Sequence, residues 1–148
     1  MSAAPRARGW IDGASRGNPG DAGFGVVFEL DDGVSEIGGF LGRTTNNVAE
    51  YSALLAALTY ARDKGVRNLE LFSDSQLLVR QFGGAYRVKA SHLVPLFLKV
   101  MALRREIPQL RLHHVPREQN AAADRLANRA IDERLALPSW LDLDALGN

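Results

Sequence analysis

Polar and apolar residues alternate along the first part of the chain in the pattern of extended strands. Residues 8–15 begin as an apolar strand that contains one carboxylate, Asp12. Large apolar side chains then occupy every second position of residues 24–30, which is typical of a strand buried on one face. The alternation continues over residues 34–42, where two consecutive glycines favour an edge position. The pattern predicts three strands joined by tight turns.

The apolar period then changes to that of a helix. Asn46 or Asn47 is placed to cap this helix, and Gly65 is placed to end it. At about 100° per residue, Glu50 falls on the same arc as Leu54. We therefore expect the Glu50 side chain to point along the buried side of the helix.

Helices and strands alternate in the rest of the chain, so strand one is expected at the centre of a mixed sheet with helices on both faces. The last helix should bury Ala123, Leu126, Ala127, Ala130 and Ile131. The predicted elements are a strand at 69–74, a helix from a Ser75 cap to about Phe82, a helix from a Ser91 cap to Arg104, a strand at 110–115 and a helix capped by Asn120.

The 148 residues, 46% of them hydrophobic and 24% charged, suffice for one compact domain. We expect this domain at residues 1–137, followed by an apolar and acidic tail at 138–148 that either packs back or engages a partner. The chain has no cysteine, which excludes disulfides, thiolate chemistry and cysteine-bound metals. With no signal-like start and no membrane-spanning run, we expect a cytoplasmic protein.

The formal net charge of +1 conceals an uneven distribution. Residues 76–117 carry eight basic side chains and one acidic side chain, a balance of +7, while the rest of the chain stands at −6. A solvated basic surface explains this balance, and so does a footprint for a polyanion. Charge alone favours the first explanation.

Four acids stand out: Asp12 inside strand one, Glu50 on a buried helical arc, Asp74 at a strand end and Asp124 near a helix start. Capping or solvation explains any one of them, as for an Asp at a strand end, but not all four together, because Asp12 and Glu50 face the core. Ligand sites in open α/β sheets lie at the carboxyl ends of strands, where Asp74 falls. Clustered carboxylates repel one another unless cations neutralise them. An all-oxygen ligand set suits Mg²⁺ or Mn²⁺ better than Zn²⁺.

With these motifs in view, the chain resembles ribonuclease H of type I over about residues 9–133. Four motifs lie in the same order as in that family, and together they are far more specific than any one alone. The matching stretches are DGASRGNPG (12–20), TTNNVAEY (44–51), SDSQ (73–76) and PREQN (116–120), which leads to ADRLAN (123–128).

The resemblance implies a five-stranded mixed sheet with strand order 3-2-1-4-5. It implies an endoribonuclease that cleaves the RNA strand of RNA–DNA hybrids and leaves 3′-hydroxyl and 5′-phosphate ends. The metal ligands would be Asp12, Glu50, Asp74 and Asp124, holding two Mg²⁺ ions with substrate, or Mn²⁺ in their place. The protein would act as a monomer on a hybrid, without a membrane and without a nucleotide cofactor.

The family's substrate contacts carry over onto residues that can reach a shallow minor groove and its 2′-hydroxyls. Phosphate contacts would set the register without reading sequence. The implied substrate-binding residues are Gly13, Ala14, Asn18, Arg43, Thr45, Asn46, Asn47 and Gln76.

Two features depart from the commoner family pattern. A short bridge at residues 83–89 replaces a basic, tryptophan-bearing helix, as in the short, archaeal-like branch, so we expect weaker hybrid binding that relies on Arg87, Lys89, Arg104 and Arg105. His114 has the spacing of the family's mobile histidine but lies in a predicted strand, where a structural hydrogen bond explains it equally well. Arg117 in the next loop is slightly favoured over His114 as the residue that assists catalysis.

Two other functions remain open from the sequence. The same fold and metals serve nucleases that cut DNA, as junction resolvases and integrase-like enzymes do, although the Asn47 and Gln76 pair argues against this. A module that binds hybrids without cutting is the second alternative, and the intact set of four acids argues against it. Cleavage assays on hybrid, duplex DNA and duplex RNA, with and without Asp12→Asn, distinguish the three.

Overall fold

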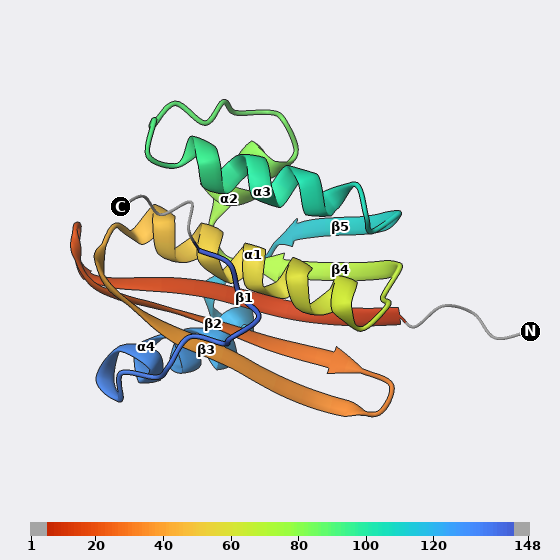
Figure 1. The fold of residues 1–148 in the computed structure, drawn as a ribbon, viewed down its shortest axis with the longest axis horizontal. Coiled ribbons are helices and arrows are strands. Elements are labelled where there is room, and N and C mark those ends of the chain that lie inside the picture. The colour runs from red at the N-terminus through yellow and green to blue at the C-terminus, as the bar shows by residue number, and fades with distance from the viewer. Residues whose placement is uncertain (1–5, 144–148) are drawn as a thin grey trace, which may run out of the picture.

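One five-stranded sheet forms the centre of the protein, and its strand order β3-β2-β1-β4-β5 confirms the predicted topology (Figure 1). The structure is a computed structural model that describes residues 6–143. β1 pairs antiparallel with β2 and parallel with β4, while β2–β3 is antiparallel and β4–β5 parallel. The strands are β1 (Arg6–Gly17), β2 (Gly20–Leu30), β3 (Gly33–Thr44), β4 (Asn68–Ser73) and β5 (Gln109–His114).

The central strand, β1, is longer than its parallel neighbour. Its pairing with β4 ends at Ile11 opposite Ser73, whereas its pairing with β2 continues to Gly17. Asp12 is therefore the first residue of β1 beyond the β4 ladder, and Asp74 is the first residue after β4. The sheet opens at this point, at the carboxyl ends of two parallel strands, where α/β folds place ligands.

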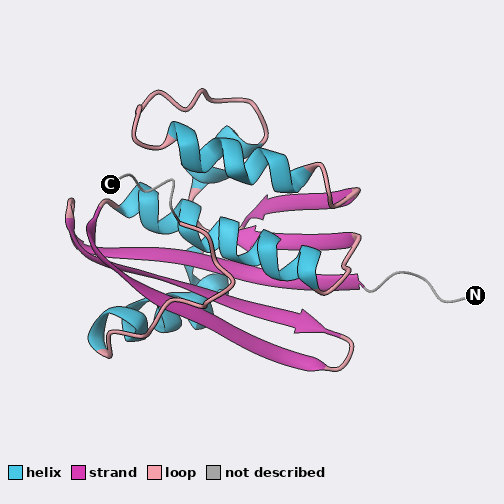
Figure 2. Ribbon diagram, viewed as in Figure 1, coloured by secondary structure: helices cyan, strands magenta, loops and turns pink. Residues whose placement is uncertain are grey.

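Helices cover both faces of the sheet, as predicted (Figure 2). α1 lies over one face with α3 packed against it, and α4 lies over β1, β2 and β3 on the other face (Figure 2). Gly25 lets α4 approach closely, because a Cβ there would lie 2.7 Å from the Ala123 carbonyl oxygen and the Ala127 nitrogen. The helices are α1 (Asn46–Asp63), α2 (Gln76–Phe82), α3 (Val94–Arg104), a 3₁₀ turn η1 (Arg117–Asn120) and α4 (Ala121–Asp132).

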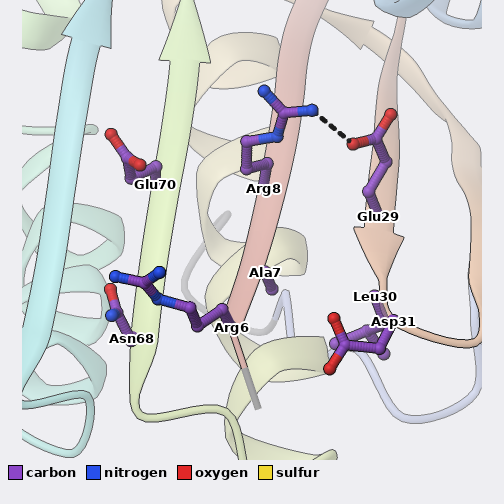
Figure 3. Close-up of a pocket in the computed structure, with 8 residues that line it drawn as sticks. All are labelled: Arg6, Ala7, Arg8, Glu29, Leu30, Asp31, Asn68 and Glu70. Carbon is purple, nitrogen blue, oxygen red and sulfur yellow. Dashed lines mark hydrogen bonds and ion pairs between the residues drawn. The ribbon is translucent and has the colours of Figure 1, made fainter.

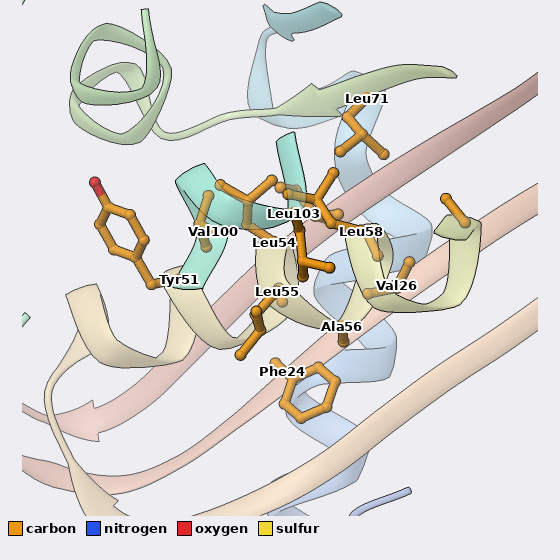
Figure 4. Packing of buried hydrophobic residues seen from close by; sticks show 14 of the residues in the cluster. Phe24, Val26, Tyr51, Leu54, Leu55, Ala56, Leu58, Leu71, Val100 and Leu103 are labelled. Carbon is orange, nitrogen blue, oxygen red and sulfur yellow. The ribbon is translucent and has the colours of Figure 1, made fainter. Parts of the chain in front are cut away.

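The hydrophobic core lies between the sheet and α1 (Figure 4). α1 buries residues on nearly every side, including Tyr51, Leu54 and Leu58, because the sheet, α3 and the chain after α4 enclose it. A helix that is apolar all round belongs inside a fold. α4, by contrast, buries one stripe, which is the predicted set of five residues.

The helix starts differ in part from the prediction. Ser75 caps α2 as expected, accepting a hydrogen bond from the Leu78 nitrogen. Thr45, not Asn46 or Asn47, caps α1 by accepting from the Val48 nitrogen, because the helix begins one residue earlier than its apolar pattern indicated.

The other two predicted caps, Ser91 and Asn120, do not cap their helices with a side-chain hydrogen bond. Ser91 lies in a turn before α3, whose N-cap position is the buried Leu93 without a side-chain hydrogen bond. Asn120 occupies the N-cap position of α4, but its side chain donates instead to the Ile11 carbonyl oxygen at 2.9 Å. A tertiary contact thus replaces the local cap.

The described part of the tail, residues 138–143, packs back on the domain. After α4 the chain passes the edge strand, where the Phe40 nitrogen donates to the Leu135 carbonyl oxygen at 2.8 Å. It then reaches the α1 side (Figure 1). There the rings of Trp140 and Tyr60 lie 5.9 Å apart. Residues 144–148 lie outside the described residues. No helix within residues 6–143 has the length and apolar character that a membrane crossing requires.

Candidate active site

The four acids singled out in the sequence come from four separate elements that meet at the open end of the sheet. Asp12 lies in β1, and Asp74 follows the last residue of β4. Glu50 lies near the start of α1, and Asp124 lies in the first turn of α4. Because α1 and α4 cover opposite faces of β1, their first turns approach Asp12 from both sides.

The pKa of Asp12 shows that the other three acids lie close enough to act on its carboxyl group. Asp12 is only 8% exposed, and the pKa of its carboxyl group is raised to about 8. Burial is the largest cause, followed by the charge of Asp74, a hydrogen bond and charge from Asp124, and the charge of Glu50. All three acids therefore act on the same buried carboxyl group, as the sequence predicted.

Hydrogen bonds partly offset the effect of burial on the pKa of Glu50. Burial raises its pKa most, and the charge of Asp74 raises it further, while hydrogen bonds from Ser75 and Asn46 lower it. The Asn46 side-chain nitrogen donates to Glu50 Oε1 at 3.2 Å. This amide, one helical turn before the acid, helps to keep Glu50 ionised beside the other carboxylates.

A divalent cation fits the chemistry of this donor set. The four side chains offer only carboxylate oxygens, which hard cations such as Mg²⁺ prefer. Among the described residues no three carboxylate or imidazole groups are already close enough to hold one ion together. Carboxylates that repel one another gain by staying apart or by taking up a proton, and Asp12 does the latter. The raised pKa of Asp12 is compatible with the absence of a preformed ion site among the described residues, because charge repulsion acts over longer distances than metal ligation.

Gly13 has a packing role that the sequence analysis missed. A Cβ at this position would overlap the backbone at Ala49 and Glu50, so only glycine lets the start of α1 lie directly on β1. This close approach delivers Glu50 to Asp12. Gly13 was predicted only as a backbone contact for substrate, although a buried glycine beside an acid in a strand is itself a signal of close approach.

The other predicted substrate residues form a rim around the acids. Asn18, in the β1–β2 turn, accepts from the Asn46 nitrogen at 3.1 Å, which ties this turn to the start of α1. Asn47 is half-buried and borders a groove of about 560 Å³ that Tyr86, Arg87 and Lys89 also line. Ala14 follows Gly13 in β1, Arg43 and Thr45 lie where β3 runs into α1, and Gln76 is exposed at the start of α2.

The two candidates for an assisting role, His114 and Arg117, are both exposed. His114 is the last residue of β5 and pairs with Ser73, next to Asp74. Arg117 is the first residue of η1, which leads into α4. The preference for Arg117 stays a prediction.

The sequence analysis assigned no separate role to the side chains of three polar residues at the site. Asn128 donates to the Asp124 carbonyl oxygen at 3.0 Å and to Asp124 Oδ1 at 3.3 Å. Arg16 in turn donates to Asn128 Oδ1 at 3.1 Å. Asn120 is buried, and its Oδ1 has no hydrogen-bond partner among residues 6–143. The spacing of four residues between Asp124 and Asn128 was a readable signal.

A second hollow lies at the other end of β1, far along the strand from Asp12 (Figure 3). Arg8 and Glu29 form an ion pair across it at 3.0 Å, and Arg6, Asp31 and Glu70 also line it. Two arginines offset most of the charge of the three acids here, so this hollow lacks the concentrated negative charge found at Asp12.

Comparison with known proteins places the chain among relatives of one kind. Residues 11–130 match the family described as reverse transcriptase-like. The chain is 44% identical to ribonuclease HI of the archaeon Halobacterium salinarum over 130 residues, which are 86% of this chain and 65% of that protein. It is 43% identical over 124 residues, 82% of its length, to a bifunctional protein of Mycobacterium tuberculosis, of which it covers 34%.

Solved structures agree with this result. The crystal structure of the H. salinarum RNase H1 superposes with a TM-score of 0.81, covering 86% of this chain and 98% of that one. LC11-RNase H1, solved in complex with an RNA/DNA hybrid, is 42% identical with a TM-score of 0.80 and coverages of 86% and 97%. The chain thus spans 65% and 34% of the two longer relatives and nearly all of both solved chains.

Proposed function

The chain belongs to the ribonuclease H1 family, and from this membership we propose that it is an endoribonuclease that hydrolyses the RNA strand of RNA–DNA hybrids. One observation carries the proposal: Asp74, Asp124 and Glu50 all raise the pKa of one buried carboxyl group, Asp12. Such a cluster is unfavourable by itself and becomes favourable when divalent cations neutralise it. The solved hybrid complex of LC11-RNase H1 supports the choice of substrate.

Asp12, Glu50, Asp74 and Asp124 would hold two Mg²⁺ ions, or Mn²⁺ in their place, when the substrate is bound. Bound ions supply positive charge at the attacking and leaving oxygens and lower the pKa of water. Asn46 offsets part of the rise that burial causes in the pKa of Glu50 and orients its carboxylate, and Gly13 keeps Glu50 close to Asp12.

The reaction is a hydrolysis at phosphorus. The oxygen of a water molecule forms a bond to the scissile phosphorus, and the bond from phosphorus to the 3′ oxygen breaks. The leaving 3′ oxygen takes up a proton to become a hydroxyl group, and the phosphate stays on the 5′ end of the downstream product. Arg117 or His114, both exposed, would assist proton transfer or product release.

Selection of the hybrid would come from the rim of the site. The backbone at Gly13 and Ala14 and the side chains of Asn18, Asn46, Asn47 and Gln76 would contact the RNA strand. Only RNA offers 2′-hydroxyls in a groove shallow enough for such side chains. Arg43 and Thr45 would hold a phosphate of the DNA strand, which fixes the register without reading sequence.

The basic surface between α2 and α3 would add affinity for the polyanion. Arg87 and Lys89 are exposed in the segment that joins α2 to α3, and Arg105 is exposed directly after α3. Arg104, which the sequence analysis included, donates to the Phe82 carbonyl oxygen at 2.7 Å and lies over the Phe82 ring. We therefore assign Arg104 to the packing of α3 on α2 and leave the phosphate contacts to the other three.

The test is cleavage of end-labelled RNA–DNA hybrid, duplex DNA and duplex RNA in Mg²⁺. The proposal expects cutting of the hybrid alone, with a 5′-phosphate product, and loss of cutting in Asp12→Asn. Asp132→Ala, which removes an exposed acid of α4 away from the cluster, is the matched control and should retain activity. Cutting of duplex DNA would favour a DNA nuclease, and retention of hybrid without cutting would favour a binding module. A monomeric state and a cytoplasmic location stay predictions from the sequence.

A further inference from the structure

We propose that Arg16 and Asn128 form a positioning pair that orients the Asp124 carboxylate for binding a divalent cation. This inference rests on the proposed function, because it assigns to Asp124 the role of a metal ligand. Neither residue is expected to touch the substrate's reacting atoms. Both act through Asp124, and the family resemblance carried over no role for either side chain.

The contacts form a continuous chain from β1 to the acid. Arg16 Nη2 donates to Asn128 Oδ1 at 3.1 Å, and Asn128 Nδ2 donates to Asp124 Oδ1 at 3.3 Å. The same Asn128 nitrogen also donates to the Asp124 backbone carbonyl oxygen at 3.0 Å. One oxygen of Asp124 is therefore engaged from the side of α4, while the carboxylate also interacts with Asp12.

Arg16 determines which way the Asn128 amide faces. A guanidinium group only donates hydrogen bonds, whereas an amide has one donating and one accepting end. With Arg16 in place, the oxygen of Asn128 must face the guanidinium, and its nitrogen must face Asp124. Without Arg16 the amide oxygen loses its donor, and the side chain of Asn128 is held only by its two hydrogen bonds to Asp124, so the Asp124 carboxylate is oriented less firmly. A metal ligand held by an outer hydrogen bond binds its ion more tightly than a free one.

A purely structural role makes a different prediction. Arg16 Nη1 also forms an ion pair with Asp132 Oδ1 at 2.9 Å, one turn beyond Asn128 on the same helix. If Arg16 only fastened α4 to β1, loss of Asp132 would have the same effect as loss of Arg16. If it acts through the amide, Asp132 is dispensable and Asn128 is not.

The experiment uses Arg16→Ala, Asn128→Ala, the double variant and Asp132→Ala in the full chain. Binding of Mn²⁺ and of Mg²⁺ is measured by calorimetry without substrate, and the Mg²⁺ concentration for half-maximal hybrid cleavage is measured separately. We expect Asn128→Ala to weaken cation binding about tenfold, Arg16→Ala to weaken it by several-fold, and KM for hybrid to stay constant. The double variant should equal Asn128→Ala, because Arg16 acts only through that residue.

Two controls separate the possible outcomes. Arg129→Ala removes an exposed arginine of α4 that pairs with Glu133 at 3.0 Å, and it should leave cation binding unchanged. Thermal unfolding of each variant reports whether the fold is retained. Additive losses in the double variant, or an Asp132→Ala effect equal to that of Arg16→Ala, would overturn the positioning role. Unchanged cation binding in both single variants would overturn it as well, while hybrid cleavage by the unmutated chain would leave the proposed function standing. A wild-type chain that neither binds cations nor cuts hybrid would overturn both.

Discussion

At the scale of single residues, Asp12 is the position where the requirements of folding and of function conflict. Burial and three neighbouring acids raise its pKa to about 8, so the folded protein without metal keeps a proton there that the unfolded chain releases near pH 4. This raised pKa contributes stability that is fully present below pH 3.8 and is lost as the pH rises toward about 8.

We therefore predict that the free energy of unfolding of the metal-free protein falls between about pH 4 and pH 8. The contribution of Asp12 has a slope of up to about 1.4 kcal/mol per pH unit. Urea unfolding in a chelator at a series of pH values measures it, and Asp12→Asn should flatten the profile. Added Mg²⁺ should flatten it too, because a bound cation favours the ionised carboxylate. An identical slope in wild type and Asp12→Asn would show that other groups cause the dependence.

The sequence identified the four acids because Asp12 and Glu50 break a local rule, the first as a charge within a strand and the second as an acid on a buried helical arc. Asp74 and Asp124 lie where acids are common, and they stood out only together with the other two and with the family motifs. It could not identify Asn120 or Asn128 in the same way, since both look like ordinary helix-capping or surface amides. Their partners, the Ile11 carbonyl oxygen and Arg16, lie 109 and 112 positions away in the chain. Contacts of that separation depend on how α4 lies against β1, and no local pattern records them.

At the scale of elements, the contact between β1 and α1 depends on Gly13. We predict that Gly13→Ala lowers the free energy of unfolding by several kcal/mol, because a methyl group there would overlap backbone atoms of α1 that cannot move independently. It should also reduce hybrid cleavage, since Glu50 would be displaced from Asp12. Chemical denaturation and cleavage rates measure the two effects.

Gly83 supplies the matched control for this substitution. Its backbone has an ordinary helical φ of −79°, and a Cβ would meet nothing closer than 3.4 Å, at the Val79 carbonyl oxygen. Gly83→Ala should therefore change stability by less than about 1 kcal/mol and leave cleavage intact. Equal effects of the two substitutions would contradict the packing role of Gly13.

The elements themselves were predictable because their apolar periods are strong, and the edge position of β3 followed from its glycines. The helix starts were less predictable for physical reasons. Five consecutive polar residues precede Val48, and sequence alone does not decide which of them caps α1. At α3 the burial of Leu93 places the helix start, so the nearby Ser91 is left in a turn.

At the scale of the whole molecule, the chain after α4 closes the fold across an edge of the sheet. Leu141 packs against the core, and Lys99 of α3 forms an ion pair with Asp142 at 2.8 Å. The composition of this tail left open whether it meets the domain or a partner, because an apolar and acidic segment suits both.

We predict that Leu141→Ala lowers the free energy of unfolding by about 1–2 kcal/mol, less than a fully buried leucine would, because the side chain is only half-buried. The rate of hybrid cleavage should not change, since the tail lies on the α1 and α3 side, away from the acids. Leu98→Ala is the control, as this leucine of α3 is 59% exposed and should contribute little. A loss of cleavage without a loss of stability would show that the tail has a role at the active site.

The last prediction, on the salt dependence of hybrid binding, follows from the distribution of charge over the molecule. Negative charge gathers at the acids, and the basic segment 76–117 supplies exposed cations beside them, so a polyanion would be drawn to the cations while metal ions neutralise the acids. Each phosphate contact releases counterions, which gives binding a steep dependence on salt. Replacing both Arg87 and Lys89 with alanine should weaken hybrid binding and lower the slope of log K against log salt by up to about 2.

The control is Arg62→Ala combined with Lys64→Ala at the far end of α1. These cations lie outside the basic segment, where Arg62 pairs with Asp63 and Lys64 lies over the Tyr60 ring. This variant removes the same net charge, so a general electrostatic attraction would be weakened equally in both. Binding is measured by fluorescence anisotropy in Ca²⁺, at several salt concentrations, with Asp12→Asn as the background to prevent cleavage. If the two double variants share one salt slope, Arg87 and Lys89 do not contact phosphate, and hybrid affinity must come from the rim around the acids.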